Sequence, residues 1–216
     1  MYQILGISRA LSLFGLLCAA VIALWMIIAP PSDPFSLKGL WKIGSSAVSA
    51  SALLVTLIGQ TPIFPMLCRL PFVRNWFPPI NGKWKVTLHS NWPAIQQRAN
   101  PGNDPIPLVP VPATITIIAR LFYIRINLLS DSNYSTSKTV FVRATRDTED
   151  GSVTLHYIYR SSIRVPETTD SESHDGAANL AVKQNGNDLW LEGVYWTNRN
   201  WHRGLNTAGV IKAYRA

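Results

Sequence analysis

The sequence contains few residues whose types and spacing are typical of catalysis. Both cysteines lie in apolar segments, and the four histidines are scattered: Cys18, Cys68, His89, His156, His174 and His202. No H-E-x-x-H, P-loop, G-x-S-x-G or dinucleotide-binding glycine pattern occurs. This disfavours a disulfide framework, a metal site and a hydrolase or transferase site. We therefore expect no catalytic residue, no metal and no cofactor.

One stretch near the C-terminus brings polar and aromatic side chains together. Residues 191–199 read LEGVYWTNR. Side chains alternate between the two faces of a strand, so one face would carry Leu191, Gly193, Tyr195, Thr197 and Arg199. A ring, a hydroxyl and a guanidinium therefore fall on one side of a predicted strand.

Alternating patterns of this kind run through the chain beyond Asn81 and predict an all-β domain. About eight strands are expected with no helix between them, near residues 84–88, 113–119, 122–130, 140–146, 152–160, 177–184, 189–197 and 207–215. We expect antiparallel strands closed as an up-and-down β-barrel, because closure removes exposed edges; a β-sandwich is the alternative. An eight-stranded barrel either fills with side chains or holds one small ligand.

Three connections between these strands are predicted to lack regular structure. They are the proline-rich residues 91–112, the polar residues 130–137 and the acidic, Ser/Thr-rich residues 161–175.

The run from Ala10 to Ala29 contains no charged, amide or histidine side chain. As a helix rising about 1.5 Å per residue it would cover the roughly 30 Å of a bilayer core. A buried helix of a soluble protein is disfavoured because the run is apolar on every face. A secretory signal peptide is disfavoured because its apolar region is usually about 7 to 15 residues long and ends at a small-x-small site.

A second uncharged stretch runs from Ile43 to Cys68 and is rich in small residues. Ser45 with Ser49, Ser46 with Ala50, and Ala47 with Ser51 are spaced one helical turn apart, and small residues at this spacing let membrane helices approach closely. We expect packing through the face that carries Ser45, Ser49 and Ala52. The alternative is a span that is merely weakly hydrophobic. We predict transmembrane helices over about residues 8–29 and 43–65, joined by a tight turn at Pro30–Pro34.

The predicted organisation is a two-helix transmembrane hairpin in residues 1–75 and a β-barrel ligand-binding domain in residues 80–216. Arg9, Arg69 and Arg74 flank the outer ends of the hairpin, against Lys38 and Lys42 in its loop. This modest bias favours both termini, and hence the barrel, in the cytoplasm. Fifteen of the twenty basic and eleven of the twelve acidic residues lie beyond Asn81, leaving that part with a charge of about +4. This balance suits an anionic small ligand or a nearby anionic leaflet, and it is also common in proteins that bind neither.

Several short motifs occur in a fixed order along this architecture. Residues 191–199 contain L-x-G-x-Y-x-T-x-R, and residues 209–215 contain G-x-I-x-x-x-R. They follow an opening G-x-W at residues 82–84 and a serine-rich segment with Ser132, Ser135 and Ser137. Over essentially its whole length the chain resembles the two-transmembrane, β-strand-rich effectors of bacterial CBASS antiphage defence. The bulky insert Asn200–Asn206 departs from the pattern and would lengthen the last hairpin.

This resemblance implies a barrel that binds a cyclic oligonucleotide, and we expect a cyclic dinucleotide, made by a partner nucleotidyltransferase of the CD-NTase class. Binding would drive homo-oligomerisation of the membrane segments, disruption of the inner membrane and abortive-infection cell death. The expected location is the bacterial inner membrane, as a multi-pass protein. The lipid bilayer is a further partner, and no nucleic-acid polymer is expected.

The resemblance also implies roles for individual residues. Arg199 and Arg215 would bind phosphate, because arginine grips its oxygens bidentately. Stacking on bases, worth about 1–3 kcal/mol per base, would fall to Trp84, Tyr157, Tyr159 and Tyr195. Hydrogen bonding would fall to Ser135, Ser137 and Thr197. The competing assignments place Trp84 and Tyr195 in the barrel core, Arg199 on a solvated hairpin and the serines in a plain loop.

Two other kinds of protein fit the same architecture. One is a membrane-tethered, lipocalin-like module that holds an acyl chain, which an apolar interior without a converging arginine would support. The other is a membrane-tethered scaffold whose barrel recognises protein. An enzyme is the least favoured reading.

Overall fold

The computed structural model describes residues 1–30, 36–97, 106–131, 134–168, 170–186 and 188–216. These residues form two compact units. The helical unit comprises Tyr2–Phe77 and Arg120–Phe122, and the barrel unit comprises Pro78–Ala119 and Tyr123–Ala216 together with Met1.

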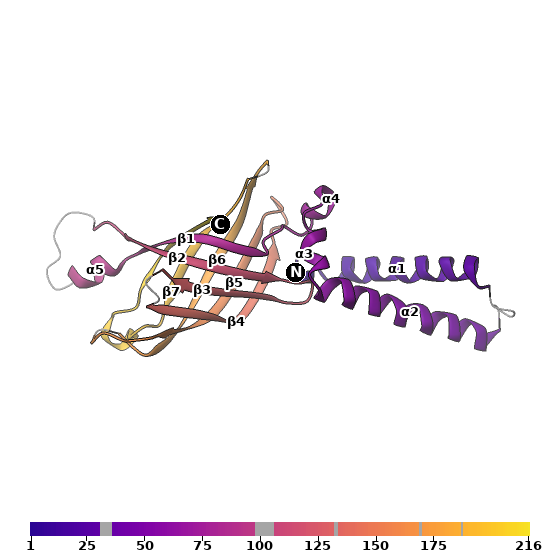
Figure 1. The fold of residues 1–216 in the computed structure, drawn as a ribbon, viewed down its shortest axis with the longest axis horizontal. Coiled ribbons are helices and arrows are strands. Elements are labelled where there is room, and N and C mark those ends of the chain that lie inside the picture. Colours follow the sequence, from indigo (N-terminus) through magenta and orange to yellow (C-terminus); the bar gives the residue numbers. More distant parts are fainter. Residues whose placement is uncertain (31–35, 98–105, 132–133, 169, 187) are drawn as a thin grey trace. The chain divides into compact units, whose positions relative to one another are not determined.

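The helical unit is built around two long helices that pack against each other, α1 (Ile7–Ile28) and α2 (Leu37–Gln60) (Figure 1). Both are long and apolar enough to cross a membrane. No α1 residue is buried, whereas α2 buries Ala47, Ser51 and Gly59. These positions are four and eight residues apart, so they lie on one face of α2. Shorter helices complete the unit: η1 (Tyr2–Ile4), α3 (Ile63–Leu67) and α4 (Pro71–Arg74).

The second long helix begins and ends earlier in the chain than the prediction of residues 43–65. Ser36 caps it, because its side chain accepts a hydrogen bond from the Gly39 backbone N–H at 3.0 Å. That cap draws the two lysines of the predicted loop into the first turns of α2. The helix stops at Gln60, and Pro62 precedes the separate α3. The predicted tight turn falls on Pro30 and residues 31–34, and the latter lie outside the described residues.

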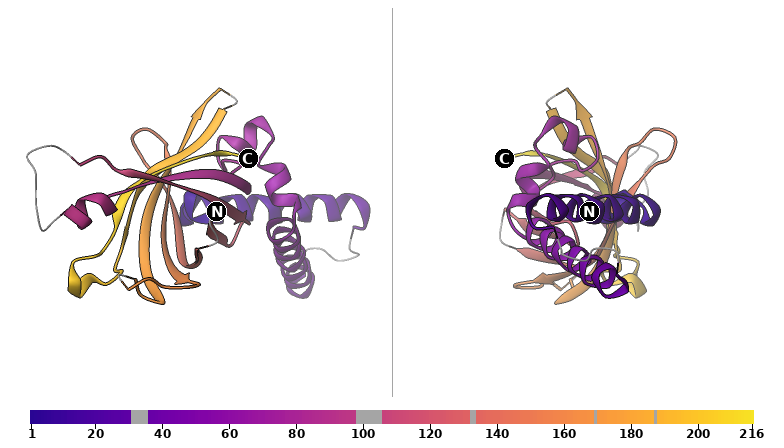
Figure 2. Two further views of the ribbon diagram at one scale, coloured as in Figure 1. Left: turned by 60° about the vertical axis from the view of Figure 1, so that its left-hand side comes forward. Right: turned by 90° about the vertical axis from the view of Figure 1, so that its right-hand side faces the viewer.

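The barrel unit is a closed, eight-stranded antiparallel barrel in which every strand pairs with its neighbours in sequence and β8 closes on β1 (Figures 1 and 2). The predicted fold class is thereby confirmed. The strands are β1 (Gly82–Ser90), β2 (Val109–Ala119), β3 (Ile124–Ser130), β4 (Ser135–Arg146), β5 (Val153–Ile163), β6 (Ser173–Asn185), β7 (Asp188–Thr197) and β8 (Ala208–Arg215). The short α5 (Trp92–Gln96) follows β1, and η3 (Trp201–Arg203) lies between β7 and β8.

The barrel interior is divided into two chemically different halves. The half around the start of β1 and the end of β8 is filled by apolar side chains, among them the fully buried Trp84, Ile115, Ile117, Ile126, Leu155, Leu180 and Leu191. The opposite half also buries hydroxyl groups, on Ser90, Ser130, Ser137, Ser161, Thr197 and Thr207. Because buried hydroxyls need hydrogen-bond partners, this second half is the candidate for binding a polar ligand.

The glycines of the two C-terminal motifs stand where backbones approach too closely for any side chain. A Cβ at Gly193 would lie 1.8 Å from the Asn179 carbonyl oxygen, and one at Gly209 would lie 1.9 Å from that of His89. Glycine at such positions lets the strands of a small barrel coil tightly. These two motif positions therefore serve the shape of the barrel.

Three predicted connections are more ordered than expected. Residues 91–112 contain α5 and the first residues of β2, which pair with the end of β1; residues 98–105 lie outside the described residues. The prediction that the serine-rich segment is a loop is wrong from Ser135 onward, because β4 starts at that residue. Ser132 lies outside the described residues. The predicted loop over residues 161–175 is shorter, because β5 continues to Ile163 and β6 starts at Ser173. Proline and serine lowered the apparent strand signal, but pairing in a closed barrel overrides local propensity.

Candidate ligand-binding site

The end of the barrel where the β1–β2, β3–β4, β5–β6 and β7–β8 connections gather is called the mouth below. Sequential antiparallel strands place these four connections at one end and the remaining three at the other. The strand termini at the mouth are Ser90, Val109, Ser130, Ser135, Ile163, Ser173, Thr197 and Ala208.

A cavity of about 260 Å³ opens inside the mouth. Seven of the nine predicted ligand-binding residues line it: Ser135, Ser137, Tyr157, Tyr159, Tyr195, Thr197 and Arg199. Apolar side chains, among them Leu88, Leu128 and Ile211, form its deeper wall. Ligand pockets usually measure about 300–1,000 Å³, so this cavity would enclose only part of a dinucleotide without some rearrangement of its mouth.

Trp84 and Arg215 do not line the cavity, and the structure does not bring them together with the other seven residues. They face each other across the β1–β8 pair at the opposite end of the barrel. Trp84 is fully buried, and its indole N–H donates to the Ile80 carbonyl at 3.0 Å. The guanidinium of Arg215 donates to the backbone carbonyls of Pro79 and Asn81. Both side chains are thus engaged in closing the apolar end.

Three tyrosines supply the aromatic surface of the cavity. The Tyr157 and Tyr159 ring centroids are 5.4 Å apart at an interplanar angle of 37°. Tyr195 lies two strands from Tyr157, with the small Ala178 between them in register. Burial raises the pKa of all three phenols, so they stay neutral and can donate hydrogen bonds. The cavity therefore offers ring surface and phenolic donors together.

Thr197 and Thr207 fix the base of the last hairpin. Their hydroxyl oxygens are 3.1 Å apart, and the Thr207 backbone N–H also donates to the Thr197 hydroxyl at 3.1 Å. The Arg199 backbone N–H donates to the same hydroxyl at 3.4 Å. The insert of residues 200–206 begins just beyond this clamp. Thr197 thus holds Arg199 at the mouth, in addition to lining the cavity itself.

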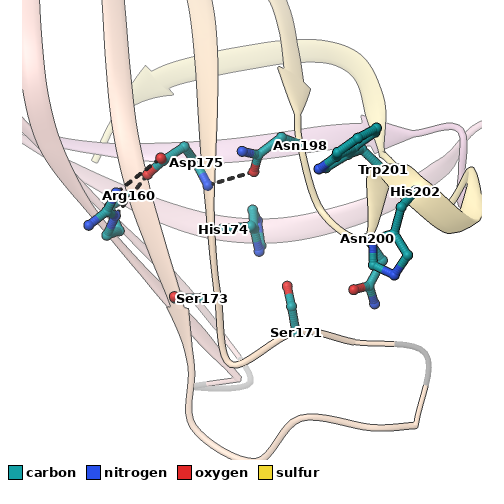
Figure 3. Close-up of a pocket in the computed structure, with 9 residues that line it drawn as sticks. All are labelled: Arg160, Ser171, Ser173, His174, Asp175, Asn198, Asn200, Trp201 and His202. Atoms are coloured by element: carbon teal, nitrogen blue, oxygen red, sulfur yellow. Dashed lines mark hydrogen bonds and ion pairs between the residues drawn. The ribbon is translucent and has the colours of Figure 1, made fainter.

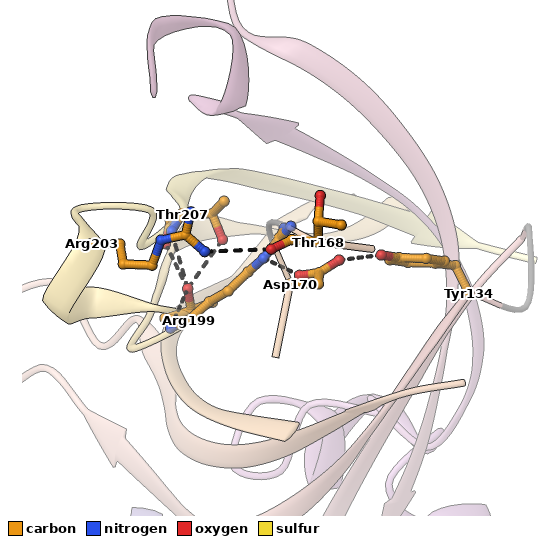
Figure 4. A network of polar contacts seen from close by, with 7 residues as sticks. Tyr134, Thr168, Asp170, Arg199, Arg203 and Thr207 are labelled. Carbon is orange, nitrogen blue, oxygen red and sulfur yellow. Dashed lines mark hydrogen bonds and ion pairs between the residues drawn. The ribbon is translucent and has the colours of Figure 1, made fainter. Parts of the chain in front are cut away.

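Arg199 and its partners bring together residues from all four mouth connections, three of which are shown in Figure 4. Its Cζ lies 4.7 Å from the centroid of the Trp92 ring, which follows β1. The guanidinium forms an ion pair with Asp170 from the β5–β6 connection, and Asp170 accepts a hydrogen bond from the hydroxyl of Tyr134, which precedes β4. The side chains of Arg199 and Asp170 are only 16% and 1% exposed. Among the described lining residues Arg199 is the one arginine, and none is a carboxylate.

Trp92 reaches this position because Asn91 joins β1 to β8. The Asn91 backbone N–H donates to the Ala208 carbonyl at 3.0 Å, and its side-chain oxygen accepts from the Ala208 N–H at 2.9 Å. The first turn of α5 therefore lies beside the start of β8, and the Trp92 ring faces the guanidinium.

A second depression of about 400 Å³ lies on the same rim, and His174 lines both it and the cavity (Figure 3). Its polar wall includes Arg160, which pairs with Asp175 at 2.8 Å, and Asn198, which accepts from the Asp175 N–H at 2.8 Å. Burial, followed by the nearby Arg199, lowers the pKa of His174. A neutral imidazole therefore separates the two hollows at neutral pH.

Four residues of this site were not among the predicted ones: Trp92, Tyr134, Asp170 and His174. All four lie in connections that were predicted to be irregular, where no periodic pattern points to a single residue. Tyr134 lies in the serine-rich segment that forms one of the sequence motifs, directly before the predicted binding residue Ser135. This position is the one feature of the sequence that could have identified Tyr134 as a site residue.

The residues assigned to packing lie on a different face of α2 from the buried one, which carries the predicted pair Ala47 and Ser51. Ser45, Ser49 and Ala52 are exposed, whereas Ala47 and Ser51 are buried. Within the part of the chain that the structure describes, no group of three or more His, Cys, Asp or Glu side chains could hold a metal ion.

Comparison with known proteins identifies a family match over the barrel. The profile of the family described as "Cap15, cyclic dinucleotide receptor domain" matches residues 75–215. CD-NTase-associated protein 15 of Escherichia albertii is 32% identical over 137 residues, which are 62% of this chain and 61% of that protein. The chain thus aligns with about three fifths of this relative's length.

Proposed function

Because the chain belongs to the Cap15 family of cyclic dinucleotide receptors, we propose that its mouth cavity binds a cyclic dinucleotide in the service of a CBASS antiphage system. The observation that carries this proposal is the convergence of Arg199, three tyrosines and several hydroxyls on one cavity. The proposal does not depend on Trp84 and Arg215, the two predicted residues at the opposite end of the barrel.

The chemistry of the cavity matches the three parts of such a ligand. Arg199 would pair with a phosphate, since hydrogen bonds to charged groups are the strong ones. Tyr157, Tyr159 and Tyr195 offer ring faces for the bases, and stacking contributes about 1–3 kcal/mol per base. Ser135 and Ser137 would bond base edges or sugars. No group in this arrangement has to break a bond, so we propose a receptor and not an enzyme.

The polar lining argues against an acyl chain as the occupant. A lipocalin-like pocket would offer an apolar interior without a converging arginine, whereas this cavity places Arg199 and the hydroxyl-bearing rim at its entrance. An alkyl chain there would remove these polar groups from water and offer them no hydrogen bond in return. Mass spectrometry of the purified protein should therefore find no stoichiometric lipid inside the barrel.

We extend the proposal to the helical unit as the part that acts on the membrane. Its two long apolar helices would span the bacterial inner membrane, with both termini in the cytoplasm, as the flanking Arg9, Arg69 and Arg74 favour. A second messenger from a partner nucleotidyltransferase would induce homo-oligomerisation through these helices. Disruption of the inner membrane and death of the infected cell would follow.

The binding half of the proposal is tested with the full chain in lipid nanodiscs. Titration calorimetry with cyclic di-AMP, di-GMP, GMP-AMP, UMP-AMP and di-UMP should give heat of binding for at least one. Arg199→Ala should weaken that binding by about ten- to a hundredfold, as expected for one charge-assisted hydrogen bond of about 1.5–3 kcal/mol. Arg160→Ala is the matched control, because Arg160 pairs with Asp175 on the exposed outer side. Absence of binding across the whole panel would refute the proposal.

A further inference from the structure

We propose that the Asp170 carboxylate occupies the phosphate subsite of the mouth cavity, and that a ligand phosphate must displace it to reach Arg199 and Tyr134. This inference rests on the proposed function. It adds Asp170 as an internal competitor of the ligand and the Tyr134 hydroxyl as a second phosphate-binding group. Its basis is the chain of contacts that runs from Arg199 through Asp170 to Tyr134 (Figure 4).

The two partners of Asp170 are donors of the kind that bind phosphate. One oxygen of the carboxylate pairs with the Arg199 guanidinium, and the other accepts a hydrogen bond from the Tyr134 hydroxyl. The two free oxygens of a phosphodiester form an anionic acceptor pair like that of a carboxylate. Arginine and tyrosine side chains are both common donors to such oxygens. A phosphate in place of this carboxylate would meet both donors.

Both partners are also lining residues of the cavity, whereas Asp170 is not among the described residues that line it. Arg199 and Tyr134 line the cavity from the β7–β8 and β3–β4 connections. Asp170 stands on the segment between β5 and β6. A ligand in the cavity would therefore meet the same two donors that the Asp170 carboxylate already occupies.

Burial makes exchange of one anion for another the favourable route. With the Asp170 side chain 1% exposed and that of Arg199 16% exposed, breaking the pair without a replacement would leave a poorly solvated charge. Removing one member of a buried ion pair is strongly destabilising for this reason. An incoming phosphate keeps Arg199 paired, while a neutral ligand does not. The arrangement thus selects for an anionic ligand.

Tyr134 is held ready to donate. Burial and the hydrogen bond to Asp170 raise the pKa of its phenol, so its proton is retained at neutral pH. Its backbone carbonyl accepts from the Arg164 N–H at 3.1 Å, which fixes the residue against the end of β5. The hydroxyl therefore stays in place when the carboxylate leaves.

A purely structural role for the same ion pair makes the opposite prediction. If Asp170 only held Arg199 in a productive position, its neutralisation would weaken ligand binding. If Asp170 competes with the ligand, its neutralisation strengthens binding. The sign of the change in affinity separates the two.

The test measures affinity for the tightest-binding cyclic dinucleotide of the panel, using the full chain in nanodiscs. Asp170→Asn, which preserves side-chain size, should lower Kd by about tenfold, as expected if the paired state holds about nine tenths of the molecules. Glu172→Gln removes an exposed acid from the same segment and should leave Kd within about twofold of wild type. Adding Tyr134→Phe to Asp170→Asn should weaken binding by about tenfold, for one lost hydrogen bond to a charged group.

The outcomes separate this inference from the proposed function. An unchanged or raised Kd for Asp170→Asn, in a protein whose circular dichroism matches wild type, would overturn the inference while binding by wild type keeps the proposed function. Binding by Asp170→Asn when wild type binds nothing supports both. If neither protein binds any member of the panel, both are refuted.

Discussion

The Arg215 guanidinium lies over the indole ring of Trp84, with its Cζ 5.1 Å from the ring centroid. The two residues are direct partners in the β1–β8 pair that closes the barrel. A cation over an indole face contributes about 0.5–1 kcal/mol at an exposed site and more where water is excluded. Together with the bond from the Trp84 indole N–H to the Ile80 carbonyl, this contact makes Trp84 a structural residue of the barrel.

Replacing Trp84 should therefore reduce stability and leave the binding site alone. Trp84→Ala should lower the free energy of unfolding by about 3–5 kcal/mol, the usual cost of deleting a large buried ring. Trp84→Phe should cost less, because it keeps most of the ring and loses the hydrogen bond. Chemical denaturation followed by circular dichroism measures both effects.

The control for this prediction is Trp196→Phe, because Trp196 is 45% exposed on the outside of the barrel. It should change stability by no more than about 0.5 kcal/mol. Folded Trp84→Phe should bind a cyclic dinucleotide as tightly as wild type does. A large loss of affinity in that variant would indicate that Trp84 takes part in ligand binding, contrary to this prediction.

The positions of the two predicted phosphate-binding residues, Arg199 and Arg215, show which features of a site alternation in the sequence can predict. Alternation placed Leu191, Tyr195 and Thr197 on one face of a strand, and all three side chains are buried. It carries no information on which end of the barrel a residue occupies. Topology does, because an eight-stranded meander puts the start of β1 and the end of β8 at one end and the end of β7 at the other. Arg199 and Arg215 therefore cannot share one mouth once the meander is accepted.

The rest of the site depends on the paths of connections, and no periodicity describes those. Asp170 and Trp92 reach Arg199 from segments far away in the sequence, and the path of Trp92 is fixed by the two hydrogen bonds between Asn91 and Ala208. A carboxylate in an acidic, Ser/Thr-rich stretch is typical of a solvated loop. Only its burial beside Arg199 distinguishes Asp170 from the other acids there.

Gly176 should be needed for the position of the Tyr159 ring. The two residues are cross-strand partners, and a Cβ at Gly176 would lie 2.3 Å from the Tyr159 Cζ. Gly176→Ala should push the ring into the cavity and weaken cyclic dinucleotide binding by up to about 1–3 kcal/mol, the contribution of one stacked base. Titration calorimetry gives the affinity, and thermal unfolding should show a further cost of overpacking.

A double-mutant cycle provides the control for this effect. If Gly176→Ala acts through the ring, adding it to Tyr159→Ala should cause no further loss of affinity, because the clashing atoms are already gone. Additive losses would mean that Gly176 matters to binding by some route other than Tyr159.

The stability of the barrel should depend on the protonation of His174. Burial and the neighbouring Arg199 lower its pKa in the fold, although Asp170 and Asp175 act in the opposite direction. The unfolded chain then binds the proton more readily, so stability should decline as pH falls through about 6.5, the ordinary pKa of histidine. The decline should level off once pH is below the folded pKa.

Melting temperatures of wild type and His174→Asn between pH 5 and 8 would check this dependence. The variant should lose stability less steeply on acidification, and the difference between the two proteins should be constant above about pH 7.5, where the histidine is neutral in both states. Equal slopes below pH 6.5 would assign the acid sensitivity to other groups.

The last prediction concerns the two small-residue faces of α2, which should have different tasks. Ala47 and Ser51 are buried within the helical unit, whereas Ser45, Ser49 and Ala52 are exposed on another face. In lipid, small residues favour close helix contact through van der Waals packing. The buried face would hold the hairpin together, and the exposed face would remain available for contact between protomers.

Leucine substitutions on each face separate these tasks. Ser45→Leu, Ser49→Leu and Ala52→Leu together should leave the ligand-free protein folded but reduce its ligand-dependent assembly in nanodiscs and the release of dye from liposomes. Ala47→Leu with Ser51→Leu, the matched change on the buried face, should instead disturb α1–α2 packing without any ligand, as measured by cysteine cross-linking between the helices. Because bulky side chains keep backbones apart, undiminished assembly of the triple variant would show that protomers meet through another surface.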